Sequence, residues 1–85
     1  MEELKKVEKG LLKRLVALVY EVNEQDLHTV DFEIIGSLSR VELRVYINGH
    51  RYNVNADVYN VIMLDTGGSL DSLLKAIENL ERLLL

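Results

Sequence analysis

Two histidines, His28 and His50, are the side chains of this sequence best suited to proton transfer or metal binding. His28 lies in a polar connection, and His50 directly follows an Asn-Gly pair that is typical of a tight turn. Neither histidine has another at a spacing that would place two imidazoles on one face of a helix or strand. Since the chain contains no cysteine, we expect no metal site, and both histidines are interpreted as turn or core-edge residues.

Serines and carboxylates are the remaining side chains that could do chemistry. A nucleophilic serine needs a positioned base, whereas turn and cap chemistry already explains the four serines. These are Ser37, Ser39, Ser69 and Ser72. General acid–base catalysis needs carboxylates that converge in a cleft, and nothing in the spacing of Asp26, Asp31, Glu33, Asp57 and Asp65 places them so. The sequence therefore predicts no catalytic centre and no cofactor, and the chain is not expected to be an enzyme.

The Gly67-Gly68-Ser69 segment could hold an anion on free N–H groups at the start of a helix. A phosphate-binding loop, however, needs its glycines and a lysine at set spacings, which are absent here. We interpret the segment as a helix-entry loop with Ser69 as the N-cap.

Composition indicates one small folded domain over residues 1–85, because 48% of the residues are hydrophobic. The lack of cysteine favours a reducing compartment. No apolar run approaches the roughly 20 residues that span a bilayer, and the charged start lacks the pattern of a signal peptide. We expect a cytoplasmic protein without a membrane partner.

The charge balance disfavours nucleic acid as a partner. Ten Lys and Arg against 14 Asp and Glu give a net charge of −4, which would repel a phosphate backbone. Basic residues cluster only near the N-terminus, at Lys5, Lys6, Lys9, Lys13 and Arg14. Nucleic-acid binding through the basic face of the first helix is therefore the alternative hypothesis.

A first helix is predicted over residues 2–24, where apolar residues recur at spacings of three and four. This stripe consists of Leu4, Val7, Leu11, Leu15, Leu18 and Val22. Leu12, Val16 and Val19 widen it in the second half, which suggests that the helix is covered on more than one side.

The period changes to two after Asp31, which predicts strands over residues 31–38 and 41–47. The Asn48-Gly49 pair then predicts a two-residue type I′ turn, because both turn positions need a positive φ. In this register one face, predicted to be buried, pairs Ile47 with His50, Val45 with Tyr52, Leu43 with Val54 and Val41 with Ala56. The other face pairs Tyr46 with Arg51, Arg44 with Asn53 and Glu42 with Asn55.

Residues 58–64 allow two interpretations: they continue the third strand past a bend near Asp57, or they form a short fourth strand. A second helix follows from Ser69. The predicted fold is a single α+β domain of order α-β-β-β(-β)-α, with an antiparallel sheet packed against two helices. Its predicted core comprises Leu11, Leu15, Leu18, Phe32, Ile34, Leu43, Val45, Tyr52, Val54, Leu73, Ile77 and Leu80.

The element order resembles that of the double-stranded RNA-binding domain, and residues 45–49, Val-Tyr-Ile-Asn-Gly, resemble that family's second strand and turn. The lysine run of that family would fall at residues 69–75, which read Ser-Leu-Asp-Ser-Leu-Leu-Lys. The resemblance therefore implies the topology and not the RNA-binding activity. The order, small size and acidity are also similar to those of phage-encoded inhibitors of host defence, including some anti-CRISPR proteins.

The sequence thus predicts a non-enzymatic module that binds a partner protein, as an inhibitor or regulator of phage or mobile-element type. Tyr and Arg, which are enriched at binding hot spots, lie on the sheet face that is predicted to face solvent. The candidate partner-binding residues on this face are Glu42, Arg44, Tyr46, Arg51, Asn53 and Asn55. Surplus apolar side chains predict a homodimer, with a candidate dimer surface made of Leu12, Val16, Val19, Leu83 and Leu84.

Overall fold

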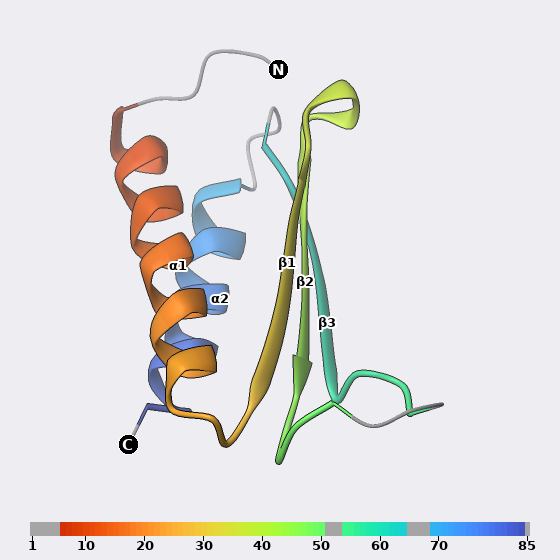
Figure 1. Cartoon of the computed structure of the whole chain (residues 1–85). Coiled ribbons are helices and arrows are strands. Elements are labelled where there is room, and N and C mark those ends of the chain that lie inside the picture. Colours follow the sequence, from red (N-terminus) through yellow and green to blue (C-terminus); the bar gives the residue numbers. More distant parts are fainter. Residues whose placement is uncertain (1–5, 51–53, 65–68, 85) are drawn as a thin grey trace.

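Three antiparallel strands form one sheet, and both helices cover the same face of it (Figure 1). The computed structural model describes residues 6–50, 54–64 and 69–84. Its elements are α1 (Lys6–Glu24), β1 (Thr29–Ile35), the 3-10 helix η1 (Gly36–Leu38), β2 (Arg40–Tyr46), β3 (Val58–Met63) and α2 (Ser69–Glu81). The strand order is β1-β2-β3. The α+β fold with its helix-strand-strand-strand-helix order confirms the prediction.

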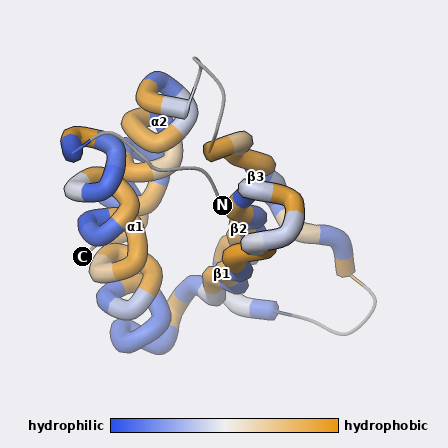
Figure 2. The backbone as a smooth tube through the Cα atoms, turned by 90° about the horizontal axis from the view of Figure 1, so that it is seen from above, coloured by the Kyte–Doolittle hydropathy of each residue, from blue (hydrophilic) through white to orange (hydrophobic). Residues whose placement is uncertain are grey.

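The core lies between the two helices and the sheet. The apolar stripe of α1 places Leu15, Leu18 and Val22 completely out of contact with solvent, and α2 contributes a second stripe with Leu73 and Leu80 at its centre. The helix sides that face the sheet are mainly hydrophobic, and the outer sides carry the hydrophilic residues (Figure 2). Because both stripes follow the 3.6-residue period of a helix, sequence pattern alone orients both helices.

Polar contacts join the two helices at both ends of α2. The Ser69 hydroxyl at the start of α2 donates a hydrogen bond of 2.6 Å to the Glu8 carboxylate of α1, and Ser69 is buried. At the other end, Arg14 forms an ion pair of 3.3 Å with Glu81. The hydroxyl of the serine that was predicted as the N-cap of this helix thus bonds to the other helix.

The predicted register of the second hairpin is wrong. β2 pairs with β3, such that Val45 lies opposite Val58, Leu43 opposite Asn60 and Val41 opposite Ile62. Residues 58–63 are thus the third strand itself and neither a continuation nor a fourth strand. This strand and the residue after it contribute two buried side chains, Ile62 and Leu64, with exposed fractions of 1% and 2%. Burial of these two large side chains favours this register over the one predicted from the turn.

Two predicted core residues are exposed. Val54 lies in the connection between β2 and β3 with 51% of its surface exposed, and Ile34 near the end of β1 is 46% exposed. Tyr52 lies outside the described residues. Leu11 and Phe32 are partly buried against the core. The other seven predicted core residues are buried, namely Leu15, Leu18, Leu43, Val45, Leu73, Ile77 and Leu80.

The turn that forms has Ile47 and Asn48 at its central positions, one residue before the predicted Asn-Gly pair, and it is not the turn of a two-residue hairpin. Asn48 and Gly49 have φ values of 65° and 98°, as predicted, whereas the Gly49 N–H bonds to the Tyr46 carbonyl at 3.1 Å. The chain then continues to Asp57, whose N–H bonds to the Val45 carbonyl at 2.8 Å and whose carboxylate accepts the Ile47 N–H at 2.7 Å. The connection therefore spans residues 47–57, and its described residues 54–57 lie on the side of the sheet away from the helices (Figure 1).

Within the described ranges, neither helix combines the length and the apolar character that crossing a membrane requires.

Candidate functional site

The face of the sheet opposite the helices carries the side chains that alternate with the core residues, and we call it the outer sheet face. It was predicted to be polar, but β3 adds apolar side chains to it. Its members are Asp31, Glu33 and Ile35 of β1, Arg40, Glu42, Arg44 and Tyr46 of β2, and Tyr59, Val61 and Met63 of β3.

Glu42 lies at the centre of the outer sheet face and is only 5% exposed. Its carboxylate accepts a hydrogen bond of 3.0 Å from the Tyr59 hydroxyl and forms ion pairs of 2.8 Å with Arg40 and 3.2 Å with Arg44. These three side chains cover it, although the sequence suggested a solvent-facing residue. A carboxylate with this many donors is fixed in place, and it fixes the two guanidinium groups in return.

The same contacts favour the ionised form of Glu42. The hydrogen bond from Tyr59 is the largest influence that lowers the pKa of Glu42 below its ordinary value, and the charges of Arg40 and Arg44 lower it further. Burial of the carboxylate raises the pKa of Glu42, but the hydrogen bond and the two positive charges outweigh this effect. Glu33 lies directly opposite Glu42 on β1, a like-charge arrangement that the two arginines offset.

Arg44 is the outer-face residue with the most distinctive surroundings. Besides its ion pair with Glu42, its guanidinium carbon lies 4.6 Å from the centre of the Tyr59 ring, in a cation–π arrangement. Its side chain remains 39% exposed. Arg44 also lines two separate hollows, one on each side of it.

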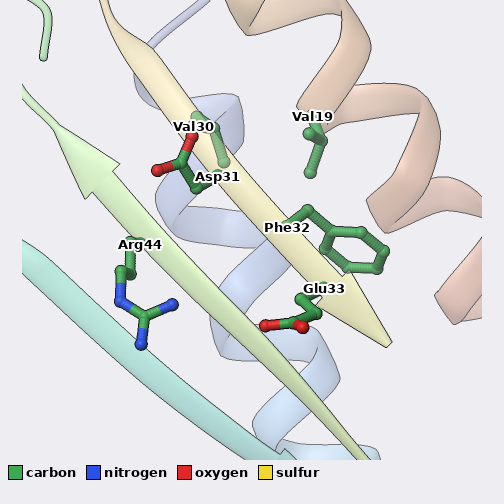
Figure 3. A pocket seen from close by; sticks show the side chains of 6 residues that line it. All are labelled: Val19, Val30, Asp31, Phe32, Glu33 and Arg44. Carbon is green, nitrogen blue, oxygen red and sulfur yellow. The ribbon is translucent and has the colours of Figure 1, made fainter. Parts of the chain in front are cut away.

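The larger hollow, of roughly 620 Å³, follows the edge of β1. Its lining consists of Val19, Val30, Asp31, Phe32, Glu33 and Arg44. Figure 3 shows Val19 and Phe32 on the side of β1 that faces α1, and the carboxylates on the side of Arg44. The hollow therefore combines an apolar side with an acidic side.

The smaller hollow, of roughly 280 Å³, lies where the β2–β3 connection meets the outer sheet face. Tyr46 and Tyr59 line it from the sheet, and Val54, Asn55 and Ala56 line it from the connection, with Arg44 between them. Tyr46 is only 8% exposed, and its ring meets that of His50 edge to face with the centroids 4.7 Å apart.

The structure brings together four of the six candidate partner-binding residues. Glu42, Arg44 and Tyr46 lie on the outer sheet face, and Asn55 reaches it from the connection. Arg51 and Asn53 lie outside the described residues. Glu42 and Tyr46 are buried, so that Arg44 and Asn55 are the accessible members of this set.

Sequence reasoning missed the contribution of β3 to this face. The accessible apolar side chains are Tyr59, Val61 and Met63, which are 53%, 42% and 40% exposed. The signal was present, because residues 58–63 are rich in strand-forming side chains, whereas residues 53–57 carry Asn and Asp, which strands disfavour. The local strength of the Asn-Gly signal led to the wrong choice.

The candidate dimer surface is largely part of the fold. Leu12, Val19, Leu83 and Leu84 are partly buried and pack against the core, whereas Val16 is 44% exposed. Self-association through this surface stays a prediction, with Val16 as its most exposed member.

The remaining candidates lie apart from the outer sheet face or support the backbone. Lys6, Lys9 and Lys13 are exposed on α1, Arg14 pairs with Glu81, and Lys5 lies outside the described residues. Nδ1 of His28 accepts the Asn48 N–H at 2.9 Å. Among the described residues, no three His, Cys, Asp or Glu side chains gather closely enough to hold a metal ion.

Comparison of the chain with protein families, with curated proteins and with solved structures finds no match.

Proposed function

We propose that the chain is a non-enzymatic module that binds a partner protein through its outer sheet face, with Arg44 at the centre of the contact. The observation that carries this proposal is the position of Arg44 between two hollows, held by Glu42 and by the Tyr59 ring. Such a module acts by occupying a surface of its partner, which is the mode of action of small inhibitors and regulators.

Preorganisation is the physical reason for this choice. A free arginine loses rotamer freedom on binding, and this loss opposes association. The ion pair and the cation–π contact already restrict Arg44 in the unbound chain. Arginine and tyrosine also dominate binding hot spots, and the surrounding Tyr59, Val61 and Met63 supply accessible apolar area.

The two hollows indicate what the partner presents. The smaller one is lined by aromatic and small apolar side chains and suits one apolar side chain of the partner. The larger one has the carboxylates of Asp31 and Glu33 in its lining, next to its apolar side. It suits a basic side chain with an apolar stem, such as lysine or arginine.

Capture from a lysate of the native host, followed by mass spectrometry, tests the proposal when wild type is compared with Arg44→Ala. We expect a protein that wild type retains and that Arg44→Ala binds roughly 30-fold more weakly, the effect of removing a hot spot of about 2 kcal/mol. Arg14→Ala is the matched control, because Arg14 also forms one ion pair and its side chain is 46% exposed. Equal retention by Arg44→Ala and Arg14→Ala would contradict the assignment of the site.

Nucleic-acid binding by α1 is the other outcome of this comparison. In that case a mobility shift with nucleic acid would weaken steeply as salt is raised. A Lys9→Glu,Lys13→Glu variant would abolish the shift, and Arg44→Ala would leave it unchanged.

A further inference from the structure

The direction of the backbone groups along β3 follows from one hydrogen bond. Leu64 donates its N–H to the Ser39 carbonyl at 2.7 Å. These two residues follow directly on the last pair of β2 and β3, Arg40 opposite Met63, so the same register extended by one residue places them opposite one another. In an antiparallel pair, residues that bond across the ladder alternate with residues that point away from it. Asn60 and Ile62 therefore bond to β2, whereas Tyr59 and Val61 direct their N–H and C=O groups to the free side of β3.

The other edge of the sheet confirms this alternation and is itself occupied. When the same alternation is continued across β2 to β1, the backbone N–H and C=O groups of Val30 point to the free side of β1. There the Asn23 carboxamide meets both of them, accepting the Val30 N–H and donating to the Val30 carbonyl, each at 2.8 Å. Asn23 thus takes the place of a neighbouring strand, and the charges of Asp31 and Glu33 further protect this edge.

The edge of β3 lacks such protection within the described part of the chain. Its residues Val58–Met63 include no charge and no proline, which are the devices that usually prevent an edge strand from pairing with another chain. Tyr59 and Val61 add exposed apolar side chains at the same edge.

We propose that β3 pairs with β3 of a second copy of this chain, antiparallel and about a two-fold axis at Asn60. This inference is independent of the proposed function. In this register Tyr59 of each copy lies opposite Val61 of the other, and their outward N–H and C=O groups form the new ladder. The two three-stranded sheets become one continuous sheet, and the outer faces of both copies remain accessible.

A second copy fits this edge for two reasons. A two-fold axis places a strand opposite the same strand of the other copy, so the uncharged β3 can pair with itself without bringing like charges together. Self-pairing of β1 would instead bring Asp31 toward Glu33. Aromatic and β-branched residues also form favourable cross-strand pairs, as Tyr59 and Val61 would.

Asn60 provides an independent observation. It lies on the helix-facing side of β3, opposite Leu43, and its Oδ1 atom is buried without a hydrogen-bond partner. Buried polar atoms are nearly always paired. At the two-fold axis the Asn60 side chains of both copies meet, and a carboxamide can serve another as donor and as acceptor after rotation about χ2.

Disulfide trapping tests the register directly, because the native chain contains no cysteine. Residues on the axis form a non-hydrogen-bonded pair with Cα atoms about 4.5 Å apart, within the range that a disulfide bridges. We expect Asn60→Cys to form a covalent dimer under mild oxidation, and Ile34→Cys, on the other edge strand, to remain monomeric. Trapping of Ile34→Cys and not of Asn60→Cys would overturn the proposal.

Sedimentation over a concentration series tests the interface without a cross-link. Wild type should approach twice its 9.7 kDa mass as the concentration rises, and Val61→Lys should shift to monomer because it charges the open edge. Ile34→Lys is the matched control, since Ile34 is 46% and Val61 42% exposed. A monomeric wild type, or a dimer lost with Val16→Glu but kept with Val61→Lys, would overturn the proposal.

Discussion

The side chain of Asn23 forms a two-bond pair with the backbone of Val30, at 2.8 Å in both directions. The same side chain donates to the Val19 carbonyl at 3.0 Å, so it links the last turn of α1 to the first residues of β1. One carboxamide thus fixes where the sheet begins relative to the helix.

Replacing Asn23 with leucine should lower the free energy of unfolding by about 1–2 kcal/mol, since the Val30 N–H and C=O lose their partners. Asn23→Asp should have an intermediate effect, because it keeps an acceptor for the N–H and lacks a donor for the carbonyl. Urea denaturation measures both values. Asn55→Ala, in the exposed part of the β2–β3 connection, is the control and should unfold like wild type; a similar loss in all three variants would contradict the role of Asn23.

The register of β2 and β3 predicts which apolar residues matter for stability. Leu43→Ala and Ile62→Ala should each cost about 2–5 kcal/mol, because both side chains are fully enclosed. Val54→Ala should change stability by less than about 0.5 kcal/mol, because Val54 is exposed. Thermal and chemical unfolding provide the comparison, and a large effect of Val54→Ala together with a small effect of Ile62→Ala would favour the two-residue hairpin instead.

Glu42 predicts an acid-dependent loss of stability. Its pKa is lower in the folded chain than its ordinary value of 4.5, so the folded state favours the ionised form. This stabilisation is fully present above the pKa of the unfolded chain and is lost as the pH falls through the pKa of the folded chain.

Tyr59→Phe removes the hydrogen bond that lowers the pKa of Glu42 most. We expect carboxyl resonances in an NMR titration to show the pKa of Glu42 moving up toward 4.5, with the acid unfolding transition shifting to higher pH. Tyr20→Phe, at an exposed tyrosine of α1, should leave the Glu42 titration unchanged. An unaltered titration in Tyr59→Phe would show that the arginines alone set the pKa of Glu42.

Replacing a glycine by a residue with a side chain should change the free energy of unfolding in opposite directions at Gly49 and at Gly10. Gly49 has a φ of 98°, and a new Cβ would lie 3.7 Å from the Leu27 carbonyl oxygen, an ordinary contact; conformation and not space opposes substitution. Gly49→Val should therefore lower the free energy of unfolding by at least 1–2 kcal/mol, roughly the cost of a left-handed backbone. Gly10→Ala, with nothing within 4 Å of its Cβ, should raise it by about 1 kcal/mol. Melting temperatures that move in the same direction would refute this assignment.

The helices were the most predictable part of the fold, because a helical stripe depends only on local spacing. Leu15, Leu18 and Val22 share one face whatever lies opposite them. Strand register depends instead on competition between distant segments, and the burial of Ile62 and Leu64 outweighs the local turn at Asn48.

The candidate site could be predicted in part for the same reason. The place of Arg44 on the outer sheet face followed from the alternation of side chains within β2. A change of the partner strand by an even number of residues leaves this alternation unchanged. Tyr59 and Val61 could not be placed without the register. The burial of Glu42 was equally out of reach, because it results from the arginine and tyrosine side chains that fold over it.

The long connection between β2 and β3 has a consequence for how the chain folds. The native partner of Val45 is Val58, and the hairpin that the Asn-Gly pair favours locally would place Tyr52 there instead. The two arrangements differ by an even number of residues, so each keeps the same side chains of β2 toward the helices. A hairpin with a short turn closes within microseconds, ahead of the more distant pairing that buries Ile62. The native sheet therefore has a competitor encoded in its own sequence, and folding has to undo that hairpin wherever it forms first, a local conflict of the kind that roughens an energy landscape.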